Sequence, residues 1–324
     1  MKVAIYGAGA IGGLIGAHLA RTGQDVTLIA RGPHLAALKD KGLHLTGHSG
    51  EFTVHPKATE DAREAGPQDF VIVALKANAV PGIADKLAPL LGPDTGVVMA
   101  VNGVPWWYFY GAEGPLRDAR LPSVDPEDKL WQLVGPARVI GCVVYPAAEV
   151  VAPGHIHHVE NDRFSLGEAS GIKTDRVAGL SAAFIAAGFK APVKPDIRTE
   201  IWVKLWGNVA FNPLSALTGA TLVRICGDAD TRAIAKAMMT EAEAIALKLG
   251  VRMPIDVEKR INGAAAVGEH KTSMLQDIER GRPIELEAIV GAVRDLGRLV
   301  SVPTPTIDTI YALVKQKAGL LGLL

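Results

Sequence analysis

The chain has 324 residues, more than one hydrophobic core usually organises, so two domains are expected. Its 34 Lys and Arg residues balance 34 Asp and Glu residues, which argues against a nucleic-acid or membrane-surface partner. A hydrophobic content of 48% excludes a disordered chain. The two cysteines, Cys142 and Cys226, form no CxxC pair, so we expect a reducing, cytoplasmic compartment without disulfides or a thiolate zinc site.

Two stretches without formal charge need an explanation. Residues 3–20 follow Lys2 and resemble a targeting segment or a membrane span, but their five glycines suit a strand, a turn and a helix better. Residues 205–223 contain Asn208 and Asn212, whose carboxamides would be costly in hydrocarbon. We therefore predict a helix buried inside a soluble domain there, and no membrane span in either stretch.

The first half alternates β-branched runs with helical segments, as parallel βαβ units do. The expected strands are 2–6, 25–30, 70–75 and 97–101, with helices over 10–22, 33–41 and 78–91. Further strands are expected at 139–145, 155–159 and 163–166, and only helical patterns follow residue 195. The sequence thus predicts an α/β fold, with a Rossmann-like, mostly parallel sheet domain (1–195, NADP-binding) and an all-α domain (196–324, substrate-binding and catalytic).

A GxGxxG motif, whose residues are Gly7, Ala8, Gly9, Ala10, Ile11 and Gly12, follows the first strand and opens the first helix. Glycines at this turn let the backbone approach a pyrophosphate, which lies at the helix N-terminus where N–H groups and the helix dipole favour anions. The alternative is that the glycines only pack the helix against the strand. The context favours dinucleotide binding.

The second strand ends without the acid that usually binds the ribose of NAD, and Arg31 stands there instead. Because an Arg can bind a 2′-phosphate with two hydrogen bonds, the sequence predicts NADP rather than NAD. Lys76 and the pair Asn102-Gly103 follow two other strands at the same edge of the sheet. The alternatives are solvated charges at Arg31 and Lys76 and a plain turn at Asn102-Gly103.

Lys204, Asn208 and Asn212 recur every four residues and form one polar stripe on an otherwise apolar helix. Such a stripe either contacts another element or lines a ligand cavity, and we favour the cavity. A Lys suits proton donation in carbonyl reduction, because its cation stabilises a developing alkoxide. From periodicity alone, Ser273 is expected to cap a helix and Glu285 to lie in a first helical turn.

These elements together resemble the 2-dehydropantoate 2-reductase (ketopantoate reductase) family over nearly the whole chain. The resemblance rests on GAGAIG with Arg31, on Lys76, on Asn102-Gly103, and on the segments PGHIHHVENDRFSLGE, KLWGNVAFNPLSAL and KTSMLQDIERGRPIELEAIVG. It implies NADPH-dependent reduction of a small 2-keto acid, ketopantoate, to (R)-pantoate, in the pantothenate branch leading to coenzyme A.

The resemblance also implies roles for single residues. Lys204 would be the general acid, and Glu285 would bind the substrate hydroxyl. Lys76 and Asn102 would lie beside the nicotinamide and the substrate. The substrate would be positioned by Asn208, Asn212 and Ser273. No metal is implied.

The chain departs from the family pattern near the substrate. Ala79 and Val101 stand where the family often has Gln, and Val104-Pro105-Trp106-Trp107-Tyr108-Phe109-Tyr110 follows Gly103, with a longer than usual segment to about Pro136. A paralogue that reduces a bulkier or aromatic 2-keto acid is therefore an alternative. A catalytically silent NADP-binding sensor is another, although such a sensor would not need Lys204 and its polar partners. A homodimer is compatible with the sequence.

The aromatic segment 105–131 contains Trp106, Trp107, Tyr108, Phe109, Tyr110 and Trp131. Its start follows a strand end, so it is a candidate lid or wall of the substrate pocket; the alternative is a satellite core or a dimer contact. His155 and His157 share one strand face and His158 the other, so we expect strand polarity rather than a metal site.

Overall fold

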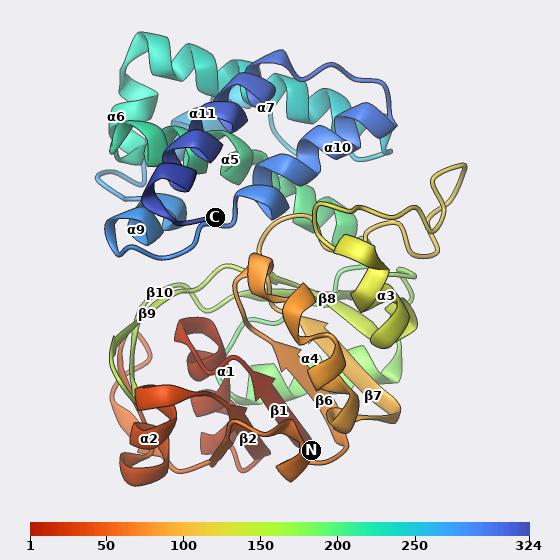
Figure 1. The fold of residues 1–324 in the computed structure, drawn as a ribbon, viewed down its shortest axis with the longest axis vertical. Helices are drawn as coiled ribbons and strands as arrows, with labels where there is room; N and C mark the ends of the chain where they lie inside the picture. The colour runs from red at the N-terminus through yellow and green to blue at the C-terminus, as the bar shows by residue number, and fades with distance from the viewer. The chain divides into compact units, whose positions relative to one another are not determined.

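The computed structural model describes residues 1–324, which divide into two compact units. Unit 1 comprises Met1–Val101, Trp107–Arg120 and Glu127–Ile197; unit 2 comprises Asn102–Trp106, Leu121–Pro126 and Arg198–Leu324 (Figure 1). Two short segments from the first half of the chain thus belong to the C-terminal, helical unit. One of them begins with Asn102.

Unit 1 is built on a seven-stranded sheet with the strand order β11-β8-β7-β6-β1-β2-β5. Its strands are β1 (Lys2–Tyr6), β2 (Asp25–Ile29), β5 (Lys57–Thr59), β6 (Gln68–Val73), β7 (Leu91–Met99), β8 (Val139–Val144) and β11 (Phe164–Glu168). All neighbours pair in parallel except β11, which is antiparallel to β8. The order β5-β2-β1-β6-β7-β8 is that of a Rossmann sheet, so the predicted fold class is confirmed.

A second, four-stranded sheet lies in the same unit, with the order β4-β3-β10-β9. It consists of β3 (Leu43–Gly47), β4 (Phe52–Val54), β9 (Ala147–Ala152) and β10 (His155–Glu160). Of these strands the sequence predicted only β10. Strand β10 pairs in parallel with β3, which lies more than 100 residues earlier in the chain.

Helix α1 (Ala10–Arg21) packs against strands of both sheets, which explains the uncharged run 3–20. A Cβ on Gly16 would lie 2.7 Å from Leu28 of β2, and one on Gly13 would lie 2.8 Å from Ile156 of β10. Because the helix faces at Gly13 and Gly16 both pack against buried side chains, a charged residue on either face would be buried. Unit 1 also contains α2 (Gly32–Lys41), α3 (Lys129–Leu133), α4 (Asp175–Ala186) and the 3₁₀ turns η1 (Ala62–Glu64) and η6 (Pro136–Arg138), and η5 (Pro126–Asp128) begins at the last residue of a unit 2 segment.

The predicted helix over 78–91 is wrong. The structure has three 3₁₀ turns there instead: η2 (Ala77–Ala79), η3 (Pro81–Ile83) and η4 (Asp85–Leu90). Pro81 begins η3 and Pro89 lies inside η4, and each proline lacks the N–H that an α-helix would use. The spacing of the apolar residues predicted an α-helix here, but the two prolines prevent one.

Helices and short helical turns form the part of unit 2 that follows residue 197, as predicted. They are α5 (Ile197–Thr218), α6 (Leu222–Gly227), α7 (Ala229–Lys248), α8 (Val257–Ala265), α9 (Ser273–Glu279), the π-helical turn η7 (Glu287–Gly291), α10 (Ala292–Leu299) and α11 (Pro305–Leu321). Trp202 and Trp206 of α5 are buried, and Trp206 donates its indole N–H to the Met239 carbonyl at 2.8 Å.

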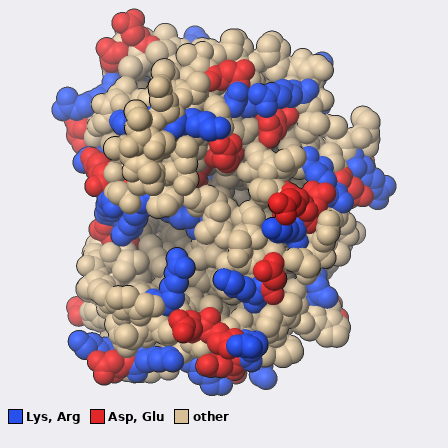
Figure 2. Space-filling model, in the orientation of Figure 1, with Lys and Arg blue, Asp and Glu red and all other residues tan.

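The uncharged stretch 205–223 spans the end of α5 and the start of α6 rather than one helix. Helix α5 ends at Thr218, and Gly219 adopts a positive φ of 74°. None of the helices combines the length and the apolar character that a membrane crossing requires. Figure 2 shows basic and acidic side chains interspersed on the face drawn, in line with the zero net charge.

Candidate functional site

The glycine-rich turn of unit 1 joins β1 to α1. Gly7 has a φ of 97°, and a Cβ there would lie 2.5 Å from Leu75. A Cβ on Gly12 would overlap the Gly7 carbonyl oxygen, whereas no atom lies within 4 Å of the position of a Cβ on Gly9. Helix α1 has no side-chain cap and no acid in its first turn. The turn is therefore open at Gly9 and presents helix N–H groups, which fits a pyrophosphate.

His34 of α2 holds this turn from outside. The Gly154 N–H donates to His34 Nδ1 at 3.0 Å, so Nδ1 carries no proton. Nε2 must then carry one, and it donates to the Ala8 carbonyl at 2.8 Å. Sequence reasoning missed His34, because no local motif marks a side chain that bonds to a turn 26 residues away.

Arg31 stands where β2 gives way to α2. It is exposed, has an extended backbone, and occupies the N-cap position of α2. Burial raises the pKa of Tyr6, the last residue of β1, and the positive charge of Arg31 opposes that rise. Arg31 is thus close to the carboxyl end of β1 as well as that of β2. The acid of β2, Asp25, lies at the opposite end of that strand.

Two further predicted residues follow strand ends. Strand β6 ends at Val73, earlier than expected, and the exposed Lys76 precedes the 3₁₀ turn η2. Strand β7 ends at Met99, and Asn102 follows as the first residue of the unit 2 segment.

Within unit 2 the structure brings together three of the predicted residues. Lys204 donates from Nζ to Asn102 Oδ1 at 2.6 Å. Asn102 in turn donates from Nδ2 to Glu285 Oε2 at 3.5 Å, a long contact. Glu285 is 4% exposed, and Lys204 is half-buried. A cation, a carboxamide and a carboxylate thus meet, which is a set that can donate a proton and hold a hydroxyl group.

The other predicted substrate residues differ in exposure. Asn208 is half-buried on α5, and Asn212 is 5% exposed, with its Nδ2 buried and without a hydrogen-bond partner. Ser273 is exposed in the first turn of α9, and no hydrogen bond joins it to Lys204 or Glu285. A buried donor without a partner is rare, so Asn212 is the residue of this group that the structure marks for a ligand.

Two expectations about helix starts are corrected. Thr272, not Ser273, caps α9, because its Oγ1 accepts the Leu275 N–H at 3.4 Å. Glu285 does not lie in a first helical turn: the helical segment begins at Leu286, and the Glu285 carbonyl accepts the Ile289 N–H at 3.3 Å. Each predicted helix start is displaced by one residue, because the apolar periodicity does not show which hydroxyl or carbonyl accepts the first hydrogen bond of the helix.

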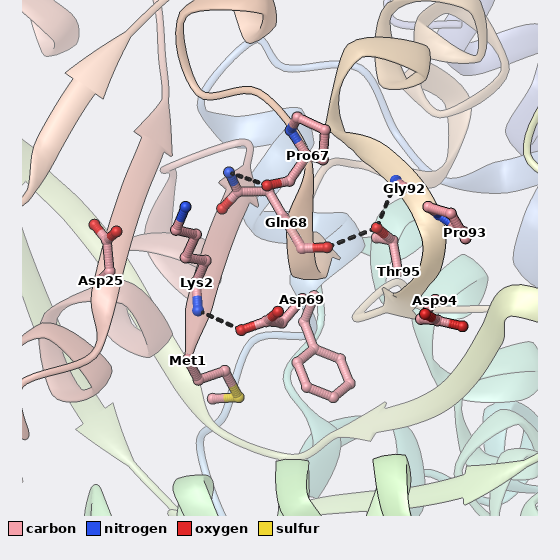
Figure 3. Close-up of a pocket in the computed structure, with 11 residues that line it drawn as sticks. Met1, Lys2, Asp25, Pro67, Gln68, Asp69, Gly92, Pro93, Asp94 and Thr95 are labelled. Carbon is pink, nitrogen blue, oxygen red and sulfur yellow. Dashed lines mark hydrogen bonds between the residues drawn. The ribbon is translucent and has the colours of Figure 1, made fainter.

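A separate hollow of about 680 Å³ lies in unit 1 at the amino ends of β1, β2 and β6. Lys2, Asp25 and Asp69 line it, and Thr95 bonds to the Gln68 carbonyl at 2.6 Å (Figure 3). The glycine turn follows the carboxyl end of β1, at the opposite edge of the sheet. This hollow is therefore not the dinucleotide site.

The aromatic segment begins with four buried side chains, and its Tyr110 and Trp131 are half-buried. Trp106, Trp107, Tyr108 and Phe109 are each at most 3% exposed. A Cβ on Gly141 of β8 would lie 2.8 Å from the Trp107 ring, so this indole packs directly on the sheet of unit 1. For Trp107 these contacts favour the packing alternative over a substrate lid.

The histidines of β10 are occupied with hydroxyl and carbonyl groups. His155 and His157 share the Thr46 hydroxyl at 2.9 and 3.2 Å. On the other face His158 is fully buried and bonds to Ser49 and, at 2.6 Å, to the Asn161 carbonyl. Burial lowers the pKa of both His155 and His158. The alternation of faces is the one predicted for strand polarity.

Comparison with known proteins matches both parts of the chain to one family. The model described as "Ketopantoate reductase PanE/ApbA" matches residues 3–171, and that of its C-terminal domain matches residues 196–318. The "2-dehydropantoate 2-reductase" of Mesorhizobium japonicum is 57% identical over 319 residues, covering 98% of each chain.

Solved structures agree with this match. A structure from Ralstonia solanacearum is 44% identical and has a TM-score of 0.95. The match covers 100% of this chain and 99% of that one. The 2-dehydropantoate 2-reductase of Geobacter metallireducens is 30% identical with a TM-score of 0.86, over 98% of this chain and 100% of that one.

Proposed function

The chain belongs to the ketopantoate reductase family, and we propose that it reduces 2-dehydropantoate to (R)-pantoate with NADPH, in the pantothenate branch leading to coenzyme A. The family makes it an oxidoreductase that uses a nicotinamide cofactor. The single observation that carries the proposal is the hydrogen bond from Lys204 to Asn102, with Glu285 next to Asn102. The names of the relatives from Mesorhizobium and Geobacter support the choice of substrate.

Lys204 supplies the proton of the reaction. A nicotinamide cofactor, when bound, delivers a hydride to the keto carbon, and the carbonyl oxygen then gains negative charge. The Lys204 ammonium stabilises that charge and donates a proton from Nζ to the oxygen. Asn102 accepts one of the Nζ hydrogens and thereby fixes the directions of the other two.

The polar residues around Lys204 bind the keto acid. Asn212 keeps a buried Nδ2 without a partner, which costs about 1–3 kcal/mol, and a substrate oxygen would satisfy it. Glu285 accepts a hydrogen bond from the substrate hydroxyl, while Asn208 and Ser273 complete the set of donors. Substrate binding would thus remove a cost that the free protein carries at Asn212.

The cofactor is held by the glycine turn and Arg31. The open position at Gly9 and the uncapped start of α1 take the pyrophosphate. Arg31, exposed after β2, would bind the 2′-phosphate, and Lys76 would lie on the nicotinamide side of the cofactor. We also propose a cytoplasmic location, in which the buried Cys142 and Cys226 remain free thiols.

The test is an NADPH-oxidation assay over a panel of 2-keto acids: 2-dehydropantoate, 2-oxoisovalerate, phenylpyruvate and benzoylformate, each repeated with NADH. We expect the highest kcat/KM for 2-dehydropantoate with NADPH. The best rate with phenylpyruvate or benzoylformate would instead identify a reductase of aromatic keto acids. Tight NADPH binding with no turnover on any substrate would identify a sensor.

A further inference from the structure

The π-helical turn η7 of unit 2 begins two residues after Glu285 and contacts the segment that carries Asn102. Gly103 has a φ of 91°, and a Cβ there would overlap the carbonyl oxygen of Ala288 and lie 2.7 Å from its carbonyl carbon. Position 103 therefore excludes a side chain for two independent reasons, a left-handed backbone and the close approach of the π-turn.

A hydrogen bond joins the same two segments. The Val104 N–H donates to the Ala288 carbonyl at 2.8 Å. Asn102 lies two residues before Val104, and its carboxamide spans from Glu285 Oε2 to Lys204 Nζ. The backbone that carries Asn102 is thus fixed on one side by the turn that also follows Glu285.

The π-turn has its own support. Its hydrogen bond runs from the Ala292 N–H to the carbonyl of Glu287, five residues earlier, so this turn contains one residue more than an α-helical turn. Tyr311 of α11 donates its hydroxyl to Glu287 Oε1 at 2.6 Å. Gly291 provides the space for this carboxylate, since a Cβ there would overlap Glu287 Oε2. Burial, and after it the contact with Glu287, raises the pKa of Tyr311, so the phenol remains a donor.

We propose that η7 is a positioning element of the active site. Through the hydrogen bond to the Ala288 carbonyl and the close packing of that carbonyl on Gly103, η7 sets the position of Asn102. Asn102 in turn sets the direction of the Lys204 ammonium. Gly103, Ala288, Glu287 and Tyr311 are then positioning residues, which act on Lys204 through Asn102. The proposal rests on the proposed function of Lys204 as the acid. It gives the irregular turn a reason to lie within a few residues of Glu285, because a regular helix would place Ala288 differently.

The test is a double-mutant cycle between Gly103→Ala and Asn102→Ala, measured by kcat and by thermal midpoint. Alone, Gly103→Ala should lower kcat about 10- to 100-fold, the scale of a displaced catalytic group. In the Asn102→Ala background the same change should lower kcat less than about 2-fold, because the residue through which it acts is gone. Its effect on the thermal midpoint should be equal in both backgrounds.

Tyr311→Phe is the milder second variant if Gly103→Ala does not fold. It should lower kcat about 3-fold in the wild-type background and leave kcat unchanged in the Asn102→Ala background. Gly219→Ala is the matched control: it also has a positive φ in unit 2, but no atom lies within 4 Å of the Cβ position. It should lower the thermal midpoint and spare kcat.

The outcomes separate this proposal from the proposed function. An active wild type in which Gly103→Ala or Tyr311→Phe lowers kcat equally in both backgrounds would overturn the positioning role alone. A wild type without activity on any 2-keto acid of the panel would overturn the proposed function, and the positioning role with it.

Discussion

Lys204 Nζ lies 2.6 Å from Asn102 Oδ1, although 102 residues separate the two in the chain. The polar stripe from which we predicted Lys204 lies on one helix, α5, so it could not identify residues of other segments. Its partner comes from a short segment after β7 that belongs to the helical unit. The reacting end of the proposed site therefore depends on a long-range contact.

Lys204→Ala should reduce turnover by about 10² or more, the usual scale for a positioned acid. NADPH affinity should remain nearly intact, because the glycine turn that we propose to hold the cofactor belongs to unit 1. Steady-state kinetics and a fluorescence titration with NADPH measure the two effects. Lys236→Ala is the control, since its ammonium pairs with Glu258 on the surface and should be dispensable. Retention of most of the turnover would make Lys204 structural.

Arg31→Ala should weaken NADPH about 10- to 100-fold, because a hydrogen bond to a charged group contributes about 1.5–3 kcal/mol. NADH affinity should change little, since NADH has no 2′-phosphate. Dissociation constants for both cofactors give the comparison. Arg63→Ala, an exposed arginine of the same unit paired with Asp61, should leave both unchanged. Equal losses for the two cofactors would contradict the assignment.

His34→Ala should weaken the binding of NADPH and NADH alike, by several-fold, because it frees the Ala8 carbonyl and loosens the turn that we propose to hold the pyrophosphate. His34→Gln offers both a donor and an acceptor and should restore part of the affinity. The uniform effect distinguishes His34 from Arg31. Affinity unchanged in His34→Ala would show that the glycine turn holds its shape without this bond.

These residues show where prediction from sequence succeeds and where it stops. The unit β1–α1–β2 was predicted nearly to the residue, because glycines, apolar runs and strand ends are local signals. Strand β3 was missed, although it pairs locally with β4, and its second partner, β10, lies more than 100 residues away. The bond from His34 to Ala8 and the π-turn beside Gly103 are also tertiary features. Periodicity carries no information about either.

Trp107→Ala should destabilise the protein by about 3–5 kcal/mol, as expected for an aromatic side chain removed from a core. Its indole is 1% exposed and packs against β8 at Gly141. Urea unfolding measures the loss, and the ranking of keto acids by kcat/KM should stay the same. Trp131→Ala is the matched change on a half-buried ring stacked by Arg120, and should cost less. A changed substrate ranking at unchanged stability would restore the lid hypothesis.

His18 lies in α1 and is 7% exposed. Its Nδ1 donates to the Ala187 carbonyl at 2.7 Å, and its buried Nε2 has no partner. Burial lowers the pKa of His18, an effect that the Ala187 bond only partly opposes, and burial likewise lowers the pKa of His158. The unfolded chain therefore takes up protons near pH 6.5 that the folded protein does not.

It follows that the free energy of unfolding is unaffected by these groups above about pH 6.5 and falls as the pH drops toward their folded pKa values. Each histidine contributes a slope of at most about 1.4 kcal/mol per pH unit. Urea unfolding at pH 7.5, 6.5, 5.5 and 5.0 should show the decline. Residue 18 cannot titrate in His18→Gln, so the free energy of unfolding should fall less steeply with decreasing pH. The slope should be lower by up to about 1.4 kcal/mol per pH unit, the contribution of one proton. Parallel curves for the variant and the wild type would show that His18 takes up its proton equally in the folded and unfolded chains.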